Sequence, residues 1–391
     1  MSDRETRHTE LAEKYLPDDL LERFRDRAEV YDRENLFCHD DLAELATQGY
    51  LSVFVPTEFG GGGLTLNEVS RLQQRLATAA PSTALAVNMH LMCTGVVRAM
   101  FERGDRSLSY VFDEALTGEI FAFGVSEASN DGVLQDSTTV AEPQPDGGYL
   151  LTGVKIFTSL SPVWTRMIAH GLDNTDENNP TLVFGFLERS ADGISTSDQW
   201  DVLGMRGSQS RATTLTKVRM RPDRVARTIP AGKHPDLLTF AIATHFQLLV
   251  GSVYAGIARR ALTLGAQGLK TRQSSKNGTT FAEVPEFRSR LADALMEYMA
   301  VPAQLETYSR DFDDLVDHGA GWPLRLISAR LNASTVARHA TESAMMCVGG
   351  AGFNAGHEIN RLFRDATASL FHPPSVDAAR PMYAAALLDD N

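Results

Sequence analysis

The spacing of hydrophobic residues changes twice along the chain, and each change predicts a new structural unit. From about residue 17 to 103, apolar residues recur at one-turn intervals, which predicts helices. Between about 120 and 225, short β-branched and aromatic runs are separated by turn-forming residues, which predicts strands. From about 234 onward, three long amphipathic stretches return and predict a helical bundle.

Two local signals predict where helices of the first segment begin. A glycine-rich turn at Gly60 to Gly63 is followed by Thr65, a residue type that caps helix N-termini well. Pro81 interrupts the pattern and precedes a second apolar helix, since proline is tolerated in a first helical turn.

The middle segment predicts an antiparallel barrel or sandwich, because no long helical pattern lies between its strands as βαβ units require. The predicted fold class is therefore α+β with three domains. They are a helical N-terminal domain over 1–118, a β-domain over 119–232 and a C-terminal helical bundle over 233–391.

Composition narrows the classes of partner. A net charge of −13 argues against binding nucleic acid or an anionic membrane surface. The sequence has no uncharged apolar run of eighteen residues and its N-terminus has no apolar signal segment, so we expect a cytoplasmic protein. Cys38, Cys93 and Cys347 are widely separated, which predicts neither a disulfide framework nor a metal site.

Five segments follow one another in an informative order: PTEFGGGGLTLNEV, FAFGVSEASNDG, GVKIFTS, VLGMRGSQSRATTLTKVRM and CVGGAGFNAGHEINRLFRDA. No dinucleotide fingerprint or Walker loop accompanies them. In this order they resemble the acyl-CoA dehydrogenase superfamily nearly from end to end. The resemblance implies a flavoprotein that encloses one FAD and is usually a homotetramer formed through the last domain.

The resemblance assigns two groups of residues to the flavin ring. Phe123, Val125 and Ser126 match positions that face the pyrimidine, where N–H and hydroxyl groups favour the charge of reduced flavin. Phe157, Thr158 and Ser159 match a tryptophan-x-threonine pattern that stacks on the ring and bonds near N5. The alternative is that these strand residues only pack.

A third group would reach the cofactor of a neighbouring subunit. Arg272 matches an arginine used on the flavin pyrophosphate, although the usual phenylalanine-glycine pair after it is replaced by SSKNG. Gly349, Gly350 and Gly352 would let main chain approach the adenosine pyrophosphate. A solvated arginine and a glycine helix cap are the alternatives.

The catalytic base of the family is absent from both of its usual positions. One position is Pro373, which also has no N–H to donate; the other, counted back from Gly251, gives Ala241 and Ile242. A shift of one residue brings His372 to the first position, so His372 is the leading catalytic candidate, with a loop-shaping role as the alternative.

Two further histidines occur on helices that the family directs toward the substrate. His90 is the second catalytic candidate, and a core histidine bonded to a backbone carbonyl is the alternative. His245 lies four residues after Ala241 on the same helical face and is a weaker candidate.

Three functions remain open. The first is α,β-dehydrogenation of an acyl-CoA thioester, with electrons leaving to electron-transfer flavoprotein. The second is a flavin-dependent monooxygenase of the same fold, similar to the dibenzothiophene and hydroxyphenylacetate enzymes, which takes reduced FAD or FMN from a flavin reductase. The third is a non-catalytic protein that binds flavin or acyl-CoA.

Overall fold

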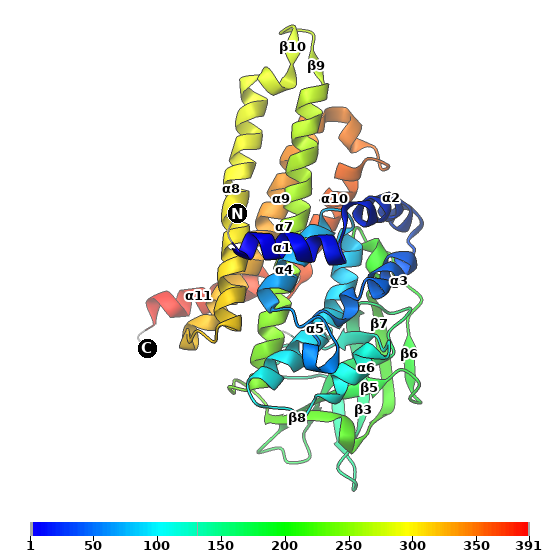
Figure 1. The fold of residues 1–391 in the computed structure, drawn as a ribbon. Coiled ribbons are helices and arrows are strands. Elements are labelled where there is room, and N and C mark those ends of the chain that lie inside the picture. Colours follow the sequence, from blue (N-terminus) through cyan, green and yellow to red (C-terminus); the bar gives the residue numbers. More distant parts are fainter. Residues whose placement is uncertain (1–2, 131, 390–391) are drawn as a thin grey trace.

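The computed structural model describes residues 3–130 and 132–389. The β-strands gather at one end of the molecule beside the N-terminal helices, and the long C-terminal helices extend away from them as a bundle (Figure 1). Six helices come first: α1 (Asp3–Tyr15), α2 (Asp18–Glu34), α3 (His39–Thr47), α4 (Leu66–Ala77), α5 (Pro81–Glu102) and α6 (Tyr110–Leu116).

The two predicted helix starts are confirmed. The Thr65 hydroxyl accepts a hydrogen bond from Glu68 N at 3.2 Å, and the Glu68 carboxylate accepts one from Thr65 N at 3.0 Å. This reciprocal capping box satisfies two backbone donors at the start of α4. Helix α5 begins at Pro81 as its first residue.

The middle segment forms one mixed sheet. Its strands are β1 (Phe121–Gly124), β2 (Val140–Pro143), β3 (Tyr149–Thr158), β4 (Arg166–Asp173), β5 (Thr181–Glu188), β6 (Ile194–Thr196), β7 (Arg211–Met220) and β8 (Val225–Pro230). The order is β6-β7-β3-β2-β4-β5-β8, with β1 paired to β4. The predicted fold class is confirmed, but the sheet is not purely antiparallel. β1 and β2 both run parallel to β4, while β2 pairs antiparallel with β3.

The last segment is built on three long helices, α7 (Leu237–Thr271), α8 (Pro285–Asp313) and α9 (Trp322–Val348). A short two-stranded ribbon, β9 (Gln273–Ser274) and β10 (Thr279–Thr280), joins α7 to α8. α10 (Glu358–Thr367) and α11 (Val376–Leu388) follow, and α11 projects from the side of the bundle in Figure 1. Gly256 allows α7 to lie against α4, since a Cβ there would lie 2.4 Å from Gln74 O, far inside contact distance.

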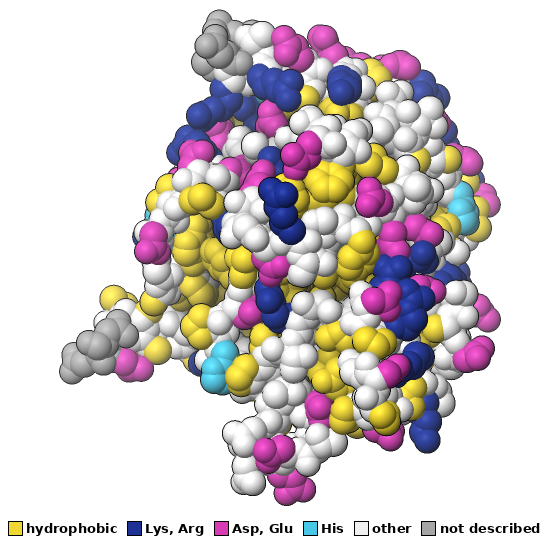
Figure 2. Space-filling view, turned by 60° about the horizontal axis from the view of Figure 1, so that its bottom comes forward, with side chains coloured by type: hydrophobic (Ala, Val, Ile, Leu, Met, Phe, Trp, Pro, Cys, Tyr) yellow, Lys and Arg dark blue, Asp and Glu magenta, His cyan; other side chains and the backbone are white. Residues whose placement is uncertain are grey.

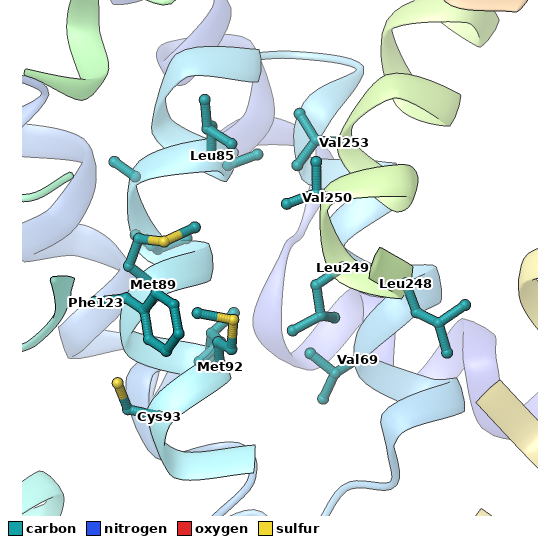
Figure 3. Close-up of a cluster of buried hydrophobic side chains, with 14 of the residues drawn as sticks. Val69, Leu85, Met89, Met92, Cys93, Phe123, Leu248, Leu249, Val250 and Val253 are labelled. Carbon is teal, nitrogen blue, oxygen red and sulfur yellow. The ribbon is translucent and has the colours of Figure 1, made fainter. Parts of the chain in front are cut away.

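The hydrophobic core continues from the first helices into the bundle. Figure 3 shows Leu85, Met89 and Met92 of α5 directed toward Leu249 and Val250 of α7. α5 and α7 are long and apolar enough to cross a membrane, but 89% and 72% of their most apolar windows are buried inside the protein. Their hydrophobicity is therefore used in packing.

Candidate active site

A cavity of about 1310 Å³ lies where the β-sheet, the N-terminal half of α7 and the start of α9 meet. Its wall is largely aromatic and aliphatic, with Phe123, Phe240, Phe246, Phe312 and Trp322 among its residues. Ala378 and Met382 place α11 on the same wall, and Figure 2 shows hydrophobic side chains gathered beside this projecting arm. A largely apolar cavity with a few polar groups is typical of a small-molecule site.

The first predicted flavin group lies partly on this cavity. Phe123 and Ser126 line it, whereas the Val125 side chain is fully buried, so Val125 has only its main chain to offer. Ile156 N donates to Ser126 O at 2.9 Å, which joins β3 to the segment after β1. The structure therefore brings the two predicted flavin groups together.

The second group presents an exposed ring and a hydroxyl pair. The Phe157 ring is 50% exposed, which leaves an aromatic surface on which an isoalloxazine can stack. Ser159 Oγ and Ser210 Oγ are 2.7 Å apart, and Ser210 continues to Ser208 Oγ at 2.8 Å. Thr158 is buried, and its Oγ1 has no hydrogen-bond partner among the described atoms. The open ring fits a flavin, whereas Thr158 and Ser159 are both buried, and none of these three residues belongs to the described cavity wall.

A buried ion pair fixes the position of both groups. Lys155 Nζ donates to Glu127 Oε1 at 2.5 Å, and both side chains are fully buried. Glu127 Oε2 also accepts Thr138 N at 2.7 Å, and Lys155 Nζ donates to His170 O at 2.7 Å. Burial lowers the pKa of Lys155 to about 8, while the Lys155 charge and its hydrogen bond outweigh desolvation and hold the pKa of Glu127 well below its usual range.

The third predicted group is also brought together. Arg272 NH1 donates to Cys347 O at 2.6 Å, and its guanidinium stacks on the Phe281 ring at 4.3 Å. Gly349 has a φ of +79°, and a Cβ there would lie 2.7 Å from the Arg272 guanidinium carbon, so glycine is needed at this position. Gly350 faces open space and Gly352 is buried.

His90 is a core histidine in this structure, the alternative considered for it above. Its Nε2 lies 2.8 Å from Leu51 O, and Phe121 N donates to its Nδ1 at 3.2 Å. Both ring nitrogens are engaged by main chain, and burial lowers its pKa to about 4. His245 is likewise buried, with Nδ1 2.8 Å from Ala241 O. Neither His90 nor His245 belongs to the described cavity wall.

His372 lies directly before two residues of that wall, Pro373 and Pro374. Its Nε2 is 2.6 Å from the hydroxyl of Tyr254, and its ring packs edge-on against Phe246. Burial, with a smaller contribution from the Arg330 guanidinium, lowers its pKa to about 3. The ring is therefore neutral at physiological pH.

The residues at the family's base positions supply no carboxylate. Pro373 and Ile242 line the cavity and Ala241 is buried behind it. Among the described wall residues the carboxylates are Asp236 and Asp317. Asp236 caps α7 by accepting Leu238 N at 2.8 Å, and Asp317 is exposed. His234, the histidine of the described wall, is exposed just before α7. The part of the wall formed by Ile242, Gln247, Pro373 and Pro374, here called the cavity floor, therefore holds no carboxylate or histidine that could remove a proton from carbon.

Sequence reasoning missed four residues of this region: Glu127, Gln247, Tyr254 and Arg330. Glu127 and Lys155 both lie in quoted motifs, so a search for complementary charges within them could have suggested the pair. Arg330 interrupts the apolar face of α9, and a charge on a buried helical face is a signal in itself. Nothing in the sequence pattern pairs Tyr254 with a histidine 118 positions away.

Comparison with known proteins identifies the family. The model of the acyl-CoA dehydrogenase N-terminal domain matches residues 10–103, and that of the C-terminal domain matches residues 248–373. The chain belongs to the acyl-CoA dehydrogenase superfamily. The sequence-based assignment is confirmed, and flavin is the cofactor of this superfamily member.

Similar relatives include enzymes with other chemistry. An L-evernosamine nitrososynthase of Micromonospora sp. is 28% identical over 91% of this chain and 84% of its own. A dibenzothiophene monooxygenase of Rhodococcus qingshengii is 23% identical over 91% and 88%. The solved structure of KijD3 with FMN and a dTDP-amino-keto sugar aligns at TM-score 0.82 and 25% identity, covering 95% and 92%. The chain is therefore a flavin-dependent oxidoreductase of this superfamily.

Within the described residues, no group of three His, Cys, Asp or Glu side chains could hold a metal ion. All three cysteines are free and buried.

Proposed function

We propose that this protein is a flavin-dependent monooxygenase that oxygenates a heteroatom of a small molecule. The observation that carries the proposal is the cavity floor, where Pro373 occupies a family base position and His372 beside it is neutral. Oxygenation of nitrogen or sulfur needs no base to remove a proton from carbon. The nitrososynthase and dibenzothiophene monooxygenase relatives support the same choice.

In this reaction one oxygen atom of O₂ is added to the substrate heteroatom and the other leaves as water. Reduced flavin supplies the two electrons. The chain's own residues hold the ring and exclude water: Phe157 offers a stacking surface, Ser126 and Ser159 offer hydroxyls, and the aromatic wall encloses the substrate. A flavin reductase is the partner that this proposal requires.

Acyl-CoA dehydrogenation is the second candidate. The sequence motifs and the matching family models favour it. It would require a base other than the two family positions, and Asp236 is already engaged as the cap of α7. An electron-transfer flavoprotein would then replace the reductase as partner.

One pair of measurements separates the two. We expect the flavin-loaded protein, supplied with NADH and a flavin reductase, to incorporate ¹⁸O from ¹⁸O₂ into dibenzothiophene or an amino sugar, read by mass spectrometry. We expect butyryl-CoA added without oxygen to leave the flavin absorbance unchanged. Anaerobic bleaching of the flavin by butyryl-CoA, with no ¹⁸O incorporated into either substrate, would favour acyl-CoA dehydrogenation over oxygenation.

We also propose a cytoplasmic homotetramer assembled through the bundle. Large apolar side chains are exposed on its helices and turns, among them Met296, Met299 and Phe353. Arg272 and Gly349 would then face a partner's flavin. Light scattering on the purified protein measures the assembly, and a monomer would remove this part of the proposal.

A further inference from the structure

A positive charge is buried directly behind the cavity floor, and none of the described carboxylates pairs with it. The Arg330 side chain on α9 is fully buried. Its Nε donates to Gln247 Oε1 at 2.6 Å, its NH2 donates to Pro374 O, and its NH1 has no partner among the described atoms.

The ionisable neighbours of Arg330 do not neutralise it. Those that act on it are the phenols of Tyr254 and Tyr383, not carboxylates. Burial raises the pKa of both phenols, so both are neutral at physiological pH. A guanidinium held only by neutral acceptors keeps most of its desolvation cost, which an anion close by would offset.

The position of this charge relates it to the cavity. Gln247 and Pro374, which accept its hydrogen bonds, both line the wall. Leu326 and Ile327, four and three residues before Arg330 and so on the same face of α9, line it as well. The guanidinium therefore lies one hydrogen bond behind the cavity surface.

Arg330 also fixes the orientation of the Gln247 amide. A guanidinium can only donate, so the amide oxygen must face Arg330 and the amide nitrogen must face away from it. That nitrogen donates one hydrogen to Pro373 O at 3.2 Å. Its second hydrogen has no acceptor among the described residues and is available to a ligand on the cavity floor.

We propose that Gln247 and Arg330 form a recognition site for an anionic oxygen of the substrate, such as a carboxylate. The Gln247 N–H makes the contact, Arg330 supplies the charge, and the aromatic wall receives an apolar body. This inference rests on the proposed function only in taking the cavity as the substrate site.

The test compares two probes of nearly equal shape, 2-naphthoate and its neutral amide 2-naphthamide. Calorimetric titration of the oxidised, flavin-loaded protein is expected to give naphthoate at least about tenfold tighter binding than naphthamide. Arg330→Met removes the positive charge, and Gln247→Glu places a carboxylate against the guanidinium and so neutralises it. Each is expected to abolish the preference for naphthoate.

Arg189→Met is the matched control. That guanidinium is also held by main-chain carbonyls, of Ser161 and Trp164, but is not part of the cavity wall. It is expected to retain the preference. If Arg330→Met fails to fold by circular dichroism, Gln247→Glu decides alone.

Equal affinities for the two probes in the wild type, no binding of either, or a preference that survives in Gln247→Glu would each overturn the proposal. If Arg330 only clamps the Pro373–Pro374 loop, its replacement would weaken both probes equally, which is also a negative result. The titration contains no reductant and no turnover. A failure of oxygen incorporation therefore leaves its outcome unchanged, and the two hypotheses fail separately.

Discussion

The hydroxyl of Tyr254 and Nε2 of His372 are joined by a hydrogen bond of 2.6 Å, and this contact determines which nitrogen of His372 carries the proton. Tyr254 is buried and its pKa is raised, so it remains a phenol with an O–H to donate. His372 is neutral because its pKa is lowered. Because a phenol is a better donor than acceptor toward a neutral imidazole, we infer that Nε2 accepts and that the proton lies on Nδ1. At neutral pH His372 offers an N–H donor from its other nitrogen and is a poor base.

Tyr254→Phe tests this assignment. Removing the phenol frees Nε2, so the imidazole is expected to change from the Nδ1–H form to a mixture of both neutral forms. Nitrogen-15 NMR of histidine-labelled protein distinguishes the forms. Tyr383→Phe is the control, because that hydroxyl donates to Leu324 O and not to the histidine. A wild-type signal from the Nε2–H form would show that the assignment is wrong.

The pKa of His372 should also respond to Arg330. Burial is the larger cause of its low pKa and the Arg330 charge is the second. Arg330→Met is therefore expected to raise the pKa above about 3 while leaving it below 6.5, the usual value. An NMR titration of the His372 ring measures the shift. An unchanged pKa would mean that the guanidinium does not act on the ring.

The Glu127–Lys155 pair predicts how stability depends on pH. The folded-state pKa of Glu127 lies below the usual 4.5, so the pair stabilises the fold above about pH 4.5 and the stabilisation is lost as pH falls below that value. Glu127→Gln leaves Lys155 buried and uncompensated, which is expected to cost about 3–5 kcal/mol at pH 7.

Thermal unfolding measured between about pH 3 and 8 tests both effects, because this interval spans the range in which carboxylates titrate. The Glu127→Gln protein should lose less stability on acidification than the wild type. Asp146→Asn is the control, because it removes an exposed partner of Arg219 and should cost much less stability than Glu127→Gln. Equal costs for the two substitutions would contradict the structural role assigned to the buried pair.

The fold could be predicted from the sequence because the signals that specify it are periodic and local. The spacing along α5 and α7 and the capping residue Thr65 each act within a few residues of chain. The parallel pairing of β1 with β4 could not be predicted in this way, because it depends on a partner about 45 positions away and on the hairpin between them.

The residues of the candidate site could be predicted only where a motif fixes a position on a strand or directly after one. A motif assigns Phe123 and Ser126 to the flavin, and the structure has both on the cavity wall, Phe123 in β1 and Ser126 two residues after its end. The role of His90 depends on where its ring points, and the Leu51 carbonyl that engages it is 39 positions away. The contact between Arg330 and Gln247 spans 83 positions and follows from how α7 and α9 face each other. Side-chain direction of this kind is set by packing and not by periodicity.

The exposed ring of Phe157 leads to the last prediction. Half of its surface is open, so replacing it by alanine should change the melting temperature little. A flavin ring that stacks there would lose about 1–3 kcal/mol, the range measured for flat bases on aromatic side chains. Phe157→Ala is therefore expected to weaken flavin binding by about five- to hundredfold, measured by quenching of flavin fluorescence. Val154→Ala is the matched control, since Val154 is 46% exposed on the same strand and should leave flavin affinity unchanged. Equal affinities for the Phe157→Ala and Val154→Ala proteins would remove Phe157 from the flavin site and leave it as an exposed strand residue whose ring packs edge-on against Trp200.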